Sequence, residues 1–231
     1  MRLIRLVSAA FILFVSGPAF AQDWIEYTSK ADFFSVNFPG EPKVQETTYL
    51  SEYGYNLPAR VYSAEVGKSR YSATVVDYSV VEKLATEKSK TCPQENVENC
   101  IGGGNAGLGY WKMDLRGALV NASWRFFQRD AKVTSYLFEF IDLVEGHQLQ
   151  LTNNADQSRT HVAIYMHQDR LYILEATVPK GYPEPGHFQY SLGFNDKGGT
   201  HEHIRYQDFY SNTYPPPPRV GRQPGPAQPG R

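Results

Sequence analysis

Only two cysteines occur in the 231 residues, Cys92 and Cys100. The seven residues between them exclude a C-x-x-C redox motif and do not fit the usual paired ligands of zinc. In an oxidising compartment an isolated pair of this kind usually forms one structural disulfide. We therefore predict a Cys92–Cys100 disulfide, worth about 2–3 kcal/mol of stability through the loop that it closes.

The apolar run at the N-terminus is too short to be a membrane anchor. It covers residues 6–15, about ten residues, whereas spanning a bilayer takes roughly 20. Arg2 and Arg5 precede it and Ala-Phe-Ala at 19–21 follows it, which is the layout of a secretory signal peptide. We expect a signal peptide over residues 1–21 and a periplasmic or secreted product. Because no cysteine follows the small residues, we expect no lipid anchor, and no transmembrane anchor after cleavage.

The sequence has no excess of basic residues. Removing the signal peptide takes away two arginines and leaves 21 basic and 24 acidic residues, a net charge of −3. Nucleic-acid-binding domains usually cluster Lys and Arg in a basic domain. We therefore expect no nucleic-acid partner.

The last 17 residues, 215–231, contain seven prolines, three glycines and one large apolar residue, Val220. Such a segment buries too little surface to offset the entropy of ordering, so we predict a disordered tail. Its three arginines and lack of acids also fit a tether to an anionic surface or a ligand for a proline-recognising partner. The remaining residues, 22–214, are expected to form a single domain.

Apolar and polar residues alternate at period two through much of this domain, which is typical of half-buried strands. We predict strands over 33–38, 60–66 and 70–78 and two hairpins. The first hairpin pairs a strand over 120–126 with one over 133–144. The second runs from 161 to 178 with its turn at Gln168 and Asp169. The residues assigned to the core face of the strand at 120–126 are Val120, Ala122, Trp124 and Phe126.

Helical signal is sparse. Residues 80–90 predict one short helix, and a second is expected after Pro185, pairing Phe188 with Leu192 at i,i+4. The fold class predicted is therefore α+β: a twisted antiparallel sheet covered by a few short helices.

Signatures of catalysis are missing from the sequence. It contains no G-x-S-x-G elbow and no S-x-x-K motif. Gly102, Gly104 and Gly107 match the dinucleotide fingerprint G-x-G-x-x-G, but the preceding residues are not a buried parallel strand and Tyr110-Trp111 resembles a strand where a helix should begin. We interpret residues 102–109 as a flexible loop, and we expect no catalytic residue and no cofactor.

Two weaker alternatives remain open. His201 and His203 would share one face of an extended segment and could start a metal site, although no third ligand accompanies them. Acids on or beside predicted strands could serve a hydrolase that cleaves sugars. These acids are Asp32, Glu65, Asp77, Glu139, Asp142 and Glu175.

Two stretches resemble exported bacterial proteins with a PsbP-like fold. Residues 32–42, DFFSVNFPGEP, are similar to the family's opening F-x-V-x-F-P-G-x-P segment. Residues 170–178, RLYILEATV, and then 188–194, FQYSLGF, are similar to its closing strand and short helix. The resemblance implies a twisted antiparallel sheet with flanking helices. It also implies an accessory, scaffold or stress-associated role without catalytic residues.

The leading hypothesis is a non-enzymatic envelope protein that binds a protein partner or a small ligand through one face of its sheet or an adjacent cleft. Tyr49, Tyr53 and Tyr55 are candidate binding residues because exposed tyrosines favour recognition. The same residues could equally pack onto the core. The sequence leaves the oligomeric state open.

Overall fold

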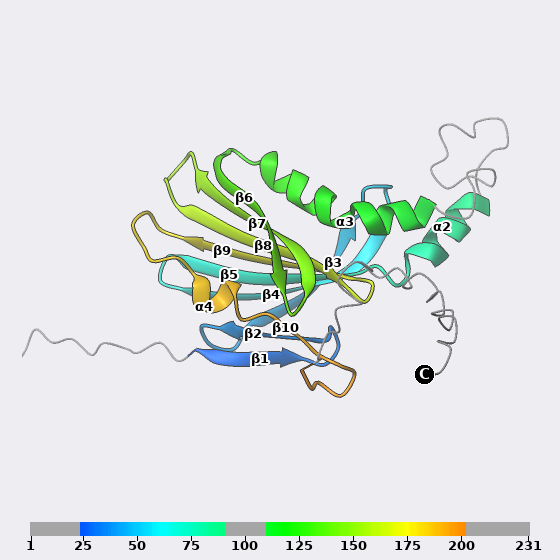
Figure 1. Cartoon of the computed structure of the whole chain (residues 1–231), viewed down its shortest axis with the longest axis horizontal. Coiled ribbons are helices and arrows are strands. Elements are labelled where there is room, and N and C mark those ends of the chain that lie inside the picture. The colour runs from blue at the N-terminus through cyan, green and yellow to red at the C-terminus, as the bar shows by residue number, and fades with distance from the viewer. Residues whose placement is uncertain (1–23, 91–109, 202–231) are drawn as a thin grey trace, which may run out of the picture.

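The computed structural model describes residues 24–90 and 110–201, and these form two antiparallel sheets and three helices (Figure 1). The larger sheet is ordered β3 (Lys43–Leu50), β4 (Asn56–Val66), β5 (Ser69–Asp77), β9 (Arg170–Val178), β8 (Arg159–His167), β7 (Val144–Asn153) and β6 (Ala131–Ile141). The smaller sheet is ordered β1 (Ile25–Ser29), β2 (Phe34–Phe38) and β10 (Gly193–Phe194). The helices are α2 (Val81–Lys90), α3 (Tyr110–Phe127) and α4 (Gly186–Gln189).

Both faces of the seven-stranded sheet are covered (Figure 1). On one, the helix face, α3 crosses β7, β8 and β9, and α2 packs against α3. On the other, the small-sheet face, lie the three-stranded sheet and α4. The core of the helix face includes Leu57, Val76, Leu119, Phe126, Leu149 and Ile164. The core of the small-sheet face includes Phe34, Phe38, Tyr62, Tyr165, Tyr172, Phe188 and Phe194.

The central strands β8 and β9 are buried along almost their whole length because both of their faces pack against a layer. They form the predicted hairpin with Gln168 and Asp169 at its turn. Both turn residues have positive φ, 45° and 57°, as a two-residue hairpin loop requires. This hairpin is confirmed, and so are the predicted strands over 33–38, 60–66 and 70–78 and the helix over 80–90.

The predicted strand over 120–126 is wrong, because these residues belong to α3, which also includes Tyr110 and Trp111. Its buried residues follow the helical spacing: Leu115, Ala118, Leu119, Ala122 and Phe126. Apolar residues also occupy the outer side of this helix. Together with the buried residues they produce an alternation at period two by coincidence, which obscures the helical period of 3.6. Of the predicted core face, Ala122 and Phe126 are buried whereas Val120 and Trp124 are exposed.

Two further boundaries differ from the prediction. Asp142 and Leu143 have positive φ and form the turn between β6 and β7, so the strand predicted over 133–144 ends at Ile141. Helix α4 ends at Gln189, which leaves Leu192 outside the helix. Phe188 and Leu192 are nevertheless both buried in the core of the small-sheet face.

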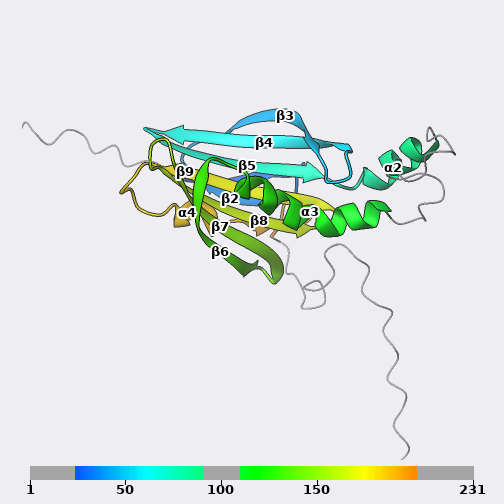
Figure 2. The same cartoon turned by 90° about the horizontal axis from the view of Figure 1, so that it is seen from above.

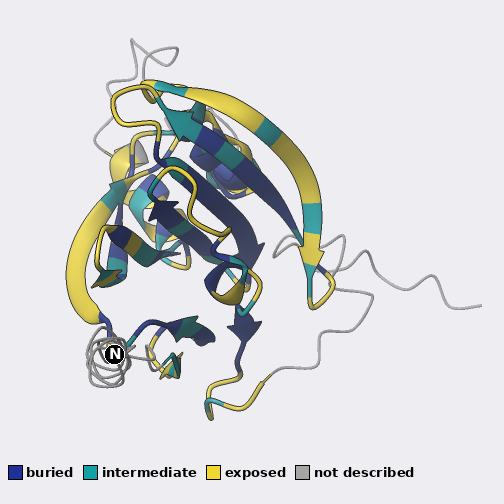
Figure 3. Cartoon of the chain, turned by 90° about the vertical axis from the view of Figure 1, so that its left-hand side faces the viewer, coloured by how far each residue is buried: buried dark blue, intermediate teal, exposed yellow. Residues whose placement is uncertain are grey.

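The fold class is α+β, as predicted, with antiparallel pairing in every strand pair of the described residues. Strands β3 and β6 are the margins of the larger sheet, and exposed residues dominate both (Figure 3). None of the described helices combines the length and apolar character needed to span a bilayer.

Candidate binding surface

Exposed apolar side chains gather on α3 and β6. Nine of the thirteen large apolar side chains that are exposed in the described residues lie between positions 113 and 143. On β6 these residues occupy both faces of the sheet, since Leu137 alternates with Tyr136 and Phe138. Neighbouring exposed apolar side chains often mark a binding site in a soluble protein. The nine are Met113, Val120, Trp124, Val133, Tyr136, Leu137, Phe138, Phe140 and Leu143.

Helix α3 exposes apolar residues because it has more of them than its buried face can accommodate. Met113, Val120 and Trp124 are separated by seven and four positions, so they form one stripe along the helix on the side away from its core residues. Strand β6 places Tyr136 and Phe138 on the same sheet face as α3, since they pair with Leu149 and His147 of β7. The stripe and the strand therefore border one surface.

Four rings connect the helix to the strand, and we call them the aromatic surface: Trp124, Phe127, Tyr136 and Phe138. Ring centroids lie 6.4 Å apart for Trp124 and Phe127, 5.2 Å for Phe127 and Tyr136, and 6.1 Å for Tyr136 and Phe138. These separations are those of interacting aromatic pairs. Trp124 and Phe138 are 58% and 67% exposed, so most of each ring is available to a partner.

His147 supports the aromatic surface from below. Its ring is 2% exposed and packs edge-on against Tyr136 and Phe138, with centroids at 5.2 and 4.9 Å. Its Nδ1 lies 2.7 Å from the hydroxyl of Ser123 and 3.0 Å from the hydroxyl of Tyr136. Ser123 is itself buried and donates to the carbonyl oxygen of Leu119. We therefore assign this serine–histidine contact to positioning the rings, not to nucleophilic catalysis.

Burial lowers the pKa of His147 from 6.5 to about 4. As the pH falls from about 6.5 to about 4, the imidazole of His147 is protonated in the unfolded chain but not in the folded chain. The free energy of unfolding therefore decreases as the pH is lowered through this range. We expect this effect of His147 to lower the free energy of unfolding by about 2–3 kcal/mol between pH 6.5 and pH 4. Urea unfolding across this range should show a shallower pH dependence for His147→Gln than for the wild type. Parallel curves would contradict the assignment.

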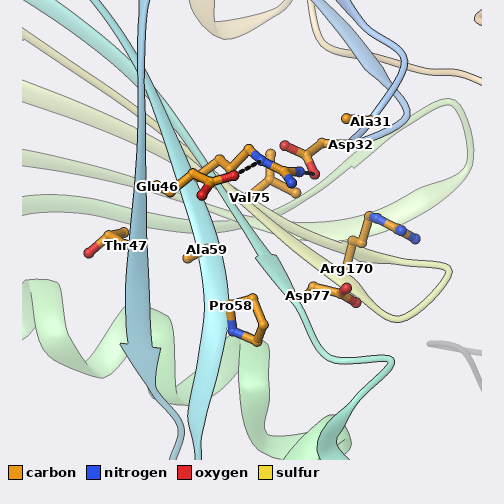
Figure 4. Close-up of a pocket in the computed structure, with 10 residues that line it drawn as sticks. Ala31, Asp32, Glu46, Thr47, Pro58, Ala59, Val75, Asp77 and Arg170 are labelled. Atoms are coloured by element: carbon orange, nitrogen blue, oxygen red, sulfur yellow. Dashed lines mark hydrogen bonds and ion pairs between the residues drawn. The ribbon is translucent and has the colours of Figure 1, made fainter.

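A separate pocket of about 280 Å³ lies between the β1–β2 loop and strands β3, β4 and β5 (Figure 4). Its charged lining residues are Asp32, Glu46, Arg60, Asp77 and Arg170. The guanidinium of Arg60 bridges two of the acids, with Nη1 2.7 Å from Asp32 and Nε 3.4 Å from Glu46. The charges of this pocket thus largely neutralise one another.

Asp32 fastens the β1–β2 loop to the larger sheet. It is 5% exposed, and besides Arg60 its carboxylate accepts a hydrogen bond of 2.5 Å from the hydroxyl of Tyr62. Its carbonyl oxygen accepts another from Tyr172, at 3.0 Å. The negative charge of Asp32 is the main cause of the raised pKa of Arg60.

The other acids considered for a hydrolase do not gather at one place. Asp77 lines the pocket that contains Asp32, whereas Glu65 and Glu175 line a second hollow of about 210 Å³. Glu175 accepts two hydrogen bonds from Arg129, at 2.6 and 2.9 Å. In the first pocket the carboxylates of Asp32 and Glu46 both pair with Arg60, and in the second hollow Glu175 pairs with Arg129. Elsewhere, Glu139 accepts from Tyr165 and Asp142 pairs with His201.

No protein-family model matches the sequence, and no curated protein matches it either. Among solved structures, the cyanobacterial PsbP protein (CyanoP) from Synechocystis sp. PCC 6803 is similar. The match covers 71% of this chain and 85% of that chain, with 9% identity and a TM-score of 0.37.

The three candidate tyrosines belong to the helix-face core or its border. Tyr55 is 3% exposed, and Tyr49 and Tyr53 are half-buried and pack against that core. The guanidinium of Arg125 lies 4.2 Å from the ring centre of Tyr49. The three tyrosines thus pack onto the core, which was the alternative to a binding role. A binding role for them stays a prediction.

Of the proposed metal ligands, His201 lies 3.1 Å from Asp142, from its Nε2 to the carboxylate, whereas His203 is outside the described residues. Within residues 24–90 and 110–201, no three potential ligands are grouped as a metal ion would need. Cys92, Cys100, residues 102–109, the signal peptide and the tail also lie outside the described residues. The residue after this glycine segment begins a helix and not a strand, which corrects one argument against the dinucleotide fingerprint. The residues before the glycine segment, 91–101, lie outside the described residues, so the argument from a missing parallel strand stays a prediction.

Sequence reasoning missed the aromatic surface because it assigned Trp124 to a core face. A signal was present: helical spacing of residues 115, 118, 119, 122 and 126 leaves Met113, Val120 and Trp124 without a place in the core. Surplus apolar residues on a helix indicate a second contact surface.

Proposed function

We propose that this chain is an exported, non-catalytic binding protein whose aromatic surface receives an apolar segment of a partner protein in the cell envelope. The observation on which this proposal depends is the concentration of exposed apolar side chains on α3 and β6. Export follows from the N-terminal sequence expected to be a signal peptide.

The composition of the surface supports a protein partner. Protein interfaces are enriched in aromatic residues and methionine and depleted of charge at their centre. Trp124, Phe138 and Met113 fit this description, and each is at least half exposed. A small polar ligand would find little to bind here, because His147 and Ser123, the polar groups below the rings, are buried and bonded to one another.

The proposal places Trp124 at the centre of the interface. Tryptophans at such positions often account for 2 kcal/mol or more of binding free energy, which is about 30-fold in affinity. We expect Trp124→Ala to weaken partner binding by about 30-fold. The measurement is capture of partners from a periplasmic extract on immobilised mature protein, followed by titration of the recovered partner.

The matched control is Val44→Ala. Val44 is 50% exposed and lies on β3, at the opposite margin of the sheet, so its replacement should leave capture unchanged. A partner retained equally by wild type and Trp124→Ala would refute the assignment of this surface. Repeated capture of nothing by the wild type would count against the function itself.

A further inference from the structure

The pocket of about 280 Å³ beside the β1–β2 loop contains two charged groups that do not take part in the Arg60 bridge. Asp77 ends β5 and Arg170 begins β9, and these strands are neighbours in the larger sheet (Figure 2). The two residues are opposed in the register, so their side chains lie on one sheet face with Cβ atoms about 5 Å apart. Figure 4 shows them together at one end of the pocket, away from Glu46. In the part of the chain that the structure describes, neither of them forms an ion pair.

Arg170 is held in place with one edge of its guanidinium unused. Its Nη1 donates to the carbonyl oxygen of Gln168 at 3.3 Å, and its guanidinium carbon lies 4.3 Å from the ring centre of Phe33. Phe33 has a φ of 55°, which is uncommon for a residue other than glycine. The remaining edge, Nε and Nη2, makes no hydrogen bond with the described residues, and Nε is buried. This edge of an arginine binds a carboxylate through two parallel hydrogen bonds.

Asp77 also has one unused atom. Its Oδ1 accepts hydrogen bonds from the backbone N–H and the hydroxyl of Ser79, at 3.0 and 2.6 Å, just before helix α2 begins. Its Oδ2 makes no hydrogen bond with the residues that the structure describes. A cationic group can therefore bind to Oδ2 while the contact with Ser79 stays in place.

The lining of the pocket suits a ligand that carries both charges. Three acids and two arginines line it, a net charge of −1, so a simple anion would meet an excess of negative charge. A simple cation would leave Nε of Arg170 buried without an acceptor. Apolar side chains, among them Pro58 and Val75, complete the lining. The volume of about 280 Å³ corresponds to about nine groups of the size of a water molecule, which limits the ligand to a small molecule.

We propose that this pocket binds a free α-amino acid with an apolar side chain. The carboxylate of the amino acid accepts from Nε and Nη2 of Arg170, its ammonium group donates to Oδ2 of Asp77, and its side chain packs against Val75 and Pro58. Both charged groups of an α-amino acid are attached to one carbon atom, which matches two protein groups on neighbouring positions of paired strands. This inference goes beyond the proposed function, because no residue of the pocket belongs to the aromatic surface.

Isothermal titration calorimetry of the full mature chain tests the proposal, with L-valine and L-leucine as probes. We expect at least one of them to saturate at one molecule per chain with a Kd below about 1 mM. Two analogues of the tighter probe separate its charges: the amide lacks the carboxylate, and the deaminated acid lacks the ammonium group. Each analogue should bind at least about tenfold more weakly, because it leaves one charged group of the pocket without a partner.

Two variants test the assigned residues. Arg170→Gln removes the fork that receives the carboxylate. Asp77→Asn removes the charge that receives the ammonium group but keeps an oxygen for Ser79. Each should weaken binding by about tenfold or more. Arg70→Gln is the matched control, since Arg70 is exposed at the opposite end of β5, and it should leave the affinity unchanged. Circular dichroism and thermal unfolding check that each variant is folded.

No heat of binding from either amino acid at about 10 mM overturns the proposal. Equal affinity for the deaminated acid would indicate a site for anions, and it overturns the assignment to an amino acid. A folded Arg170→Gln variant that binds like the wild type overturns the location. The proposed function fails or stands independently, because Trp124→Ala should bind the amino acid as the wild type does.

Discussion

Replacing Asp32 with alanine is expected to lower the free energy of unfolding by about 3–4 kcal/mol. The carboxylate is almost fully buried and accepts hydrogen bonds from Arg60 and from the hydroxyl of Tyr62. Removing one partner of a buried ion pair leaves the other charge uncompensated, which typically costs 3–5 kcal/mol. Arg60 is partly exposed, which reduces this cost, but the hydroxyl of Tyr62 also loses its acceptor.

Glu46→Ala is the matched control, since it removes the second carboxylate from the same arginine. The side chain of Glu46 is 81% exposed and its contact with Arg60 is 3.4 Å, so the effect should stay within about 0.5 kcal/mol. Urea unfolding of both variants measures the difference. Equal effects of the two substitutions would show that Asp32 does not fasten the β1–β2 loop to the sheet.

Gly146→Ala is expected to destabilise the protein by about 3–4 kcal/mol. A Cβ at this position would lie closer than 3.0 Å to two ring carbons of Tyr165 and to the backbone oxygen of Ile164. Neither neighbour can move easily, because Tyr165 is fully buried and Ile164 is in the central strand β8. Overpacking a core usually costs 1–3 kcal/mol, and a clash with backbone places this substitution at or above the upper end.

Gly186→Ala serves as the comparison at a permissive glycine. A Cβ there would meet the ring of Tyr190 at 3.4 Å, an ordinary contact, so thermal unfolding should change little. If Gly146→Ala melted like the wild type, the close approach of β7 to the ring of Tyr165 would be wrong.

The sequence predicts a helix or strand correctly when the apolar residues of that element are the ones that it buries. The β8–β9 hairpin was predicted correctly because its apolar runs are interrupted by the polar residues Gln168 and Asp169, which form its tight turn. Helix α3 was not, because Trp124 and Val120 add apolar positions outside its buried face. Periodicity assumes that apolar residues are buried, and it fails where a surface keeps them exposed for another purpose.

The candidate site shows the same division. The alternation of Tyr136, Phe138 and Phe140 can be recognised in the sequence. Their exposure, however, depends on the position of β6 at the margin of the larger sheet. The residues around His147 in the sequence do not predict its burial. Its ring lies beside Ser123 of α3, which is 24 positions earlier in the chain, and only the fold brings the two together.

By itself the sequence determined the α+β class, the central hairpin and the short helix before the cysteines, because local alternation and turn chemistry are encoded in neighbouring residues. Only the tertiary structure decided which strands lie at the margins and which face α3 covers. Those long-range choices leave Trp124 and Phe138 exposed, and they bury Asp32 against Arg60. Exposure is a property of the whole packing arrangement, so the aromatic surface could be found only once the layers were assembled.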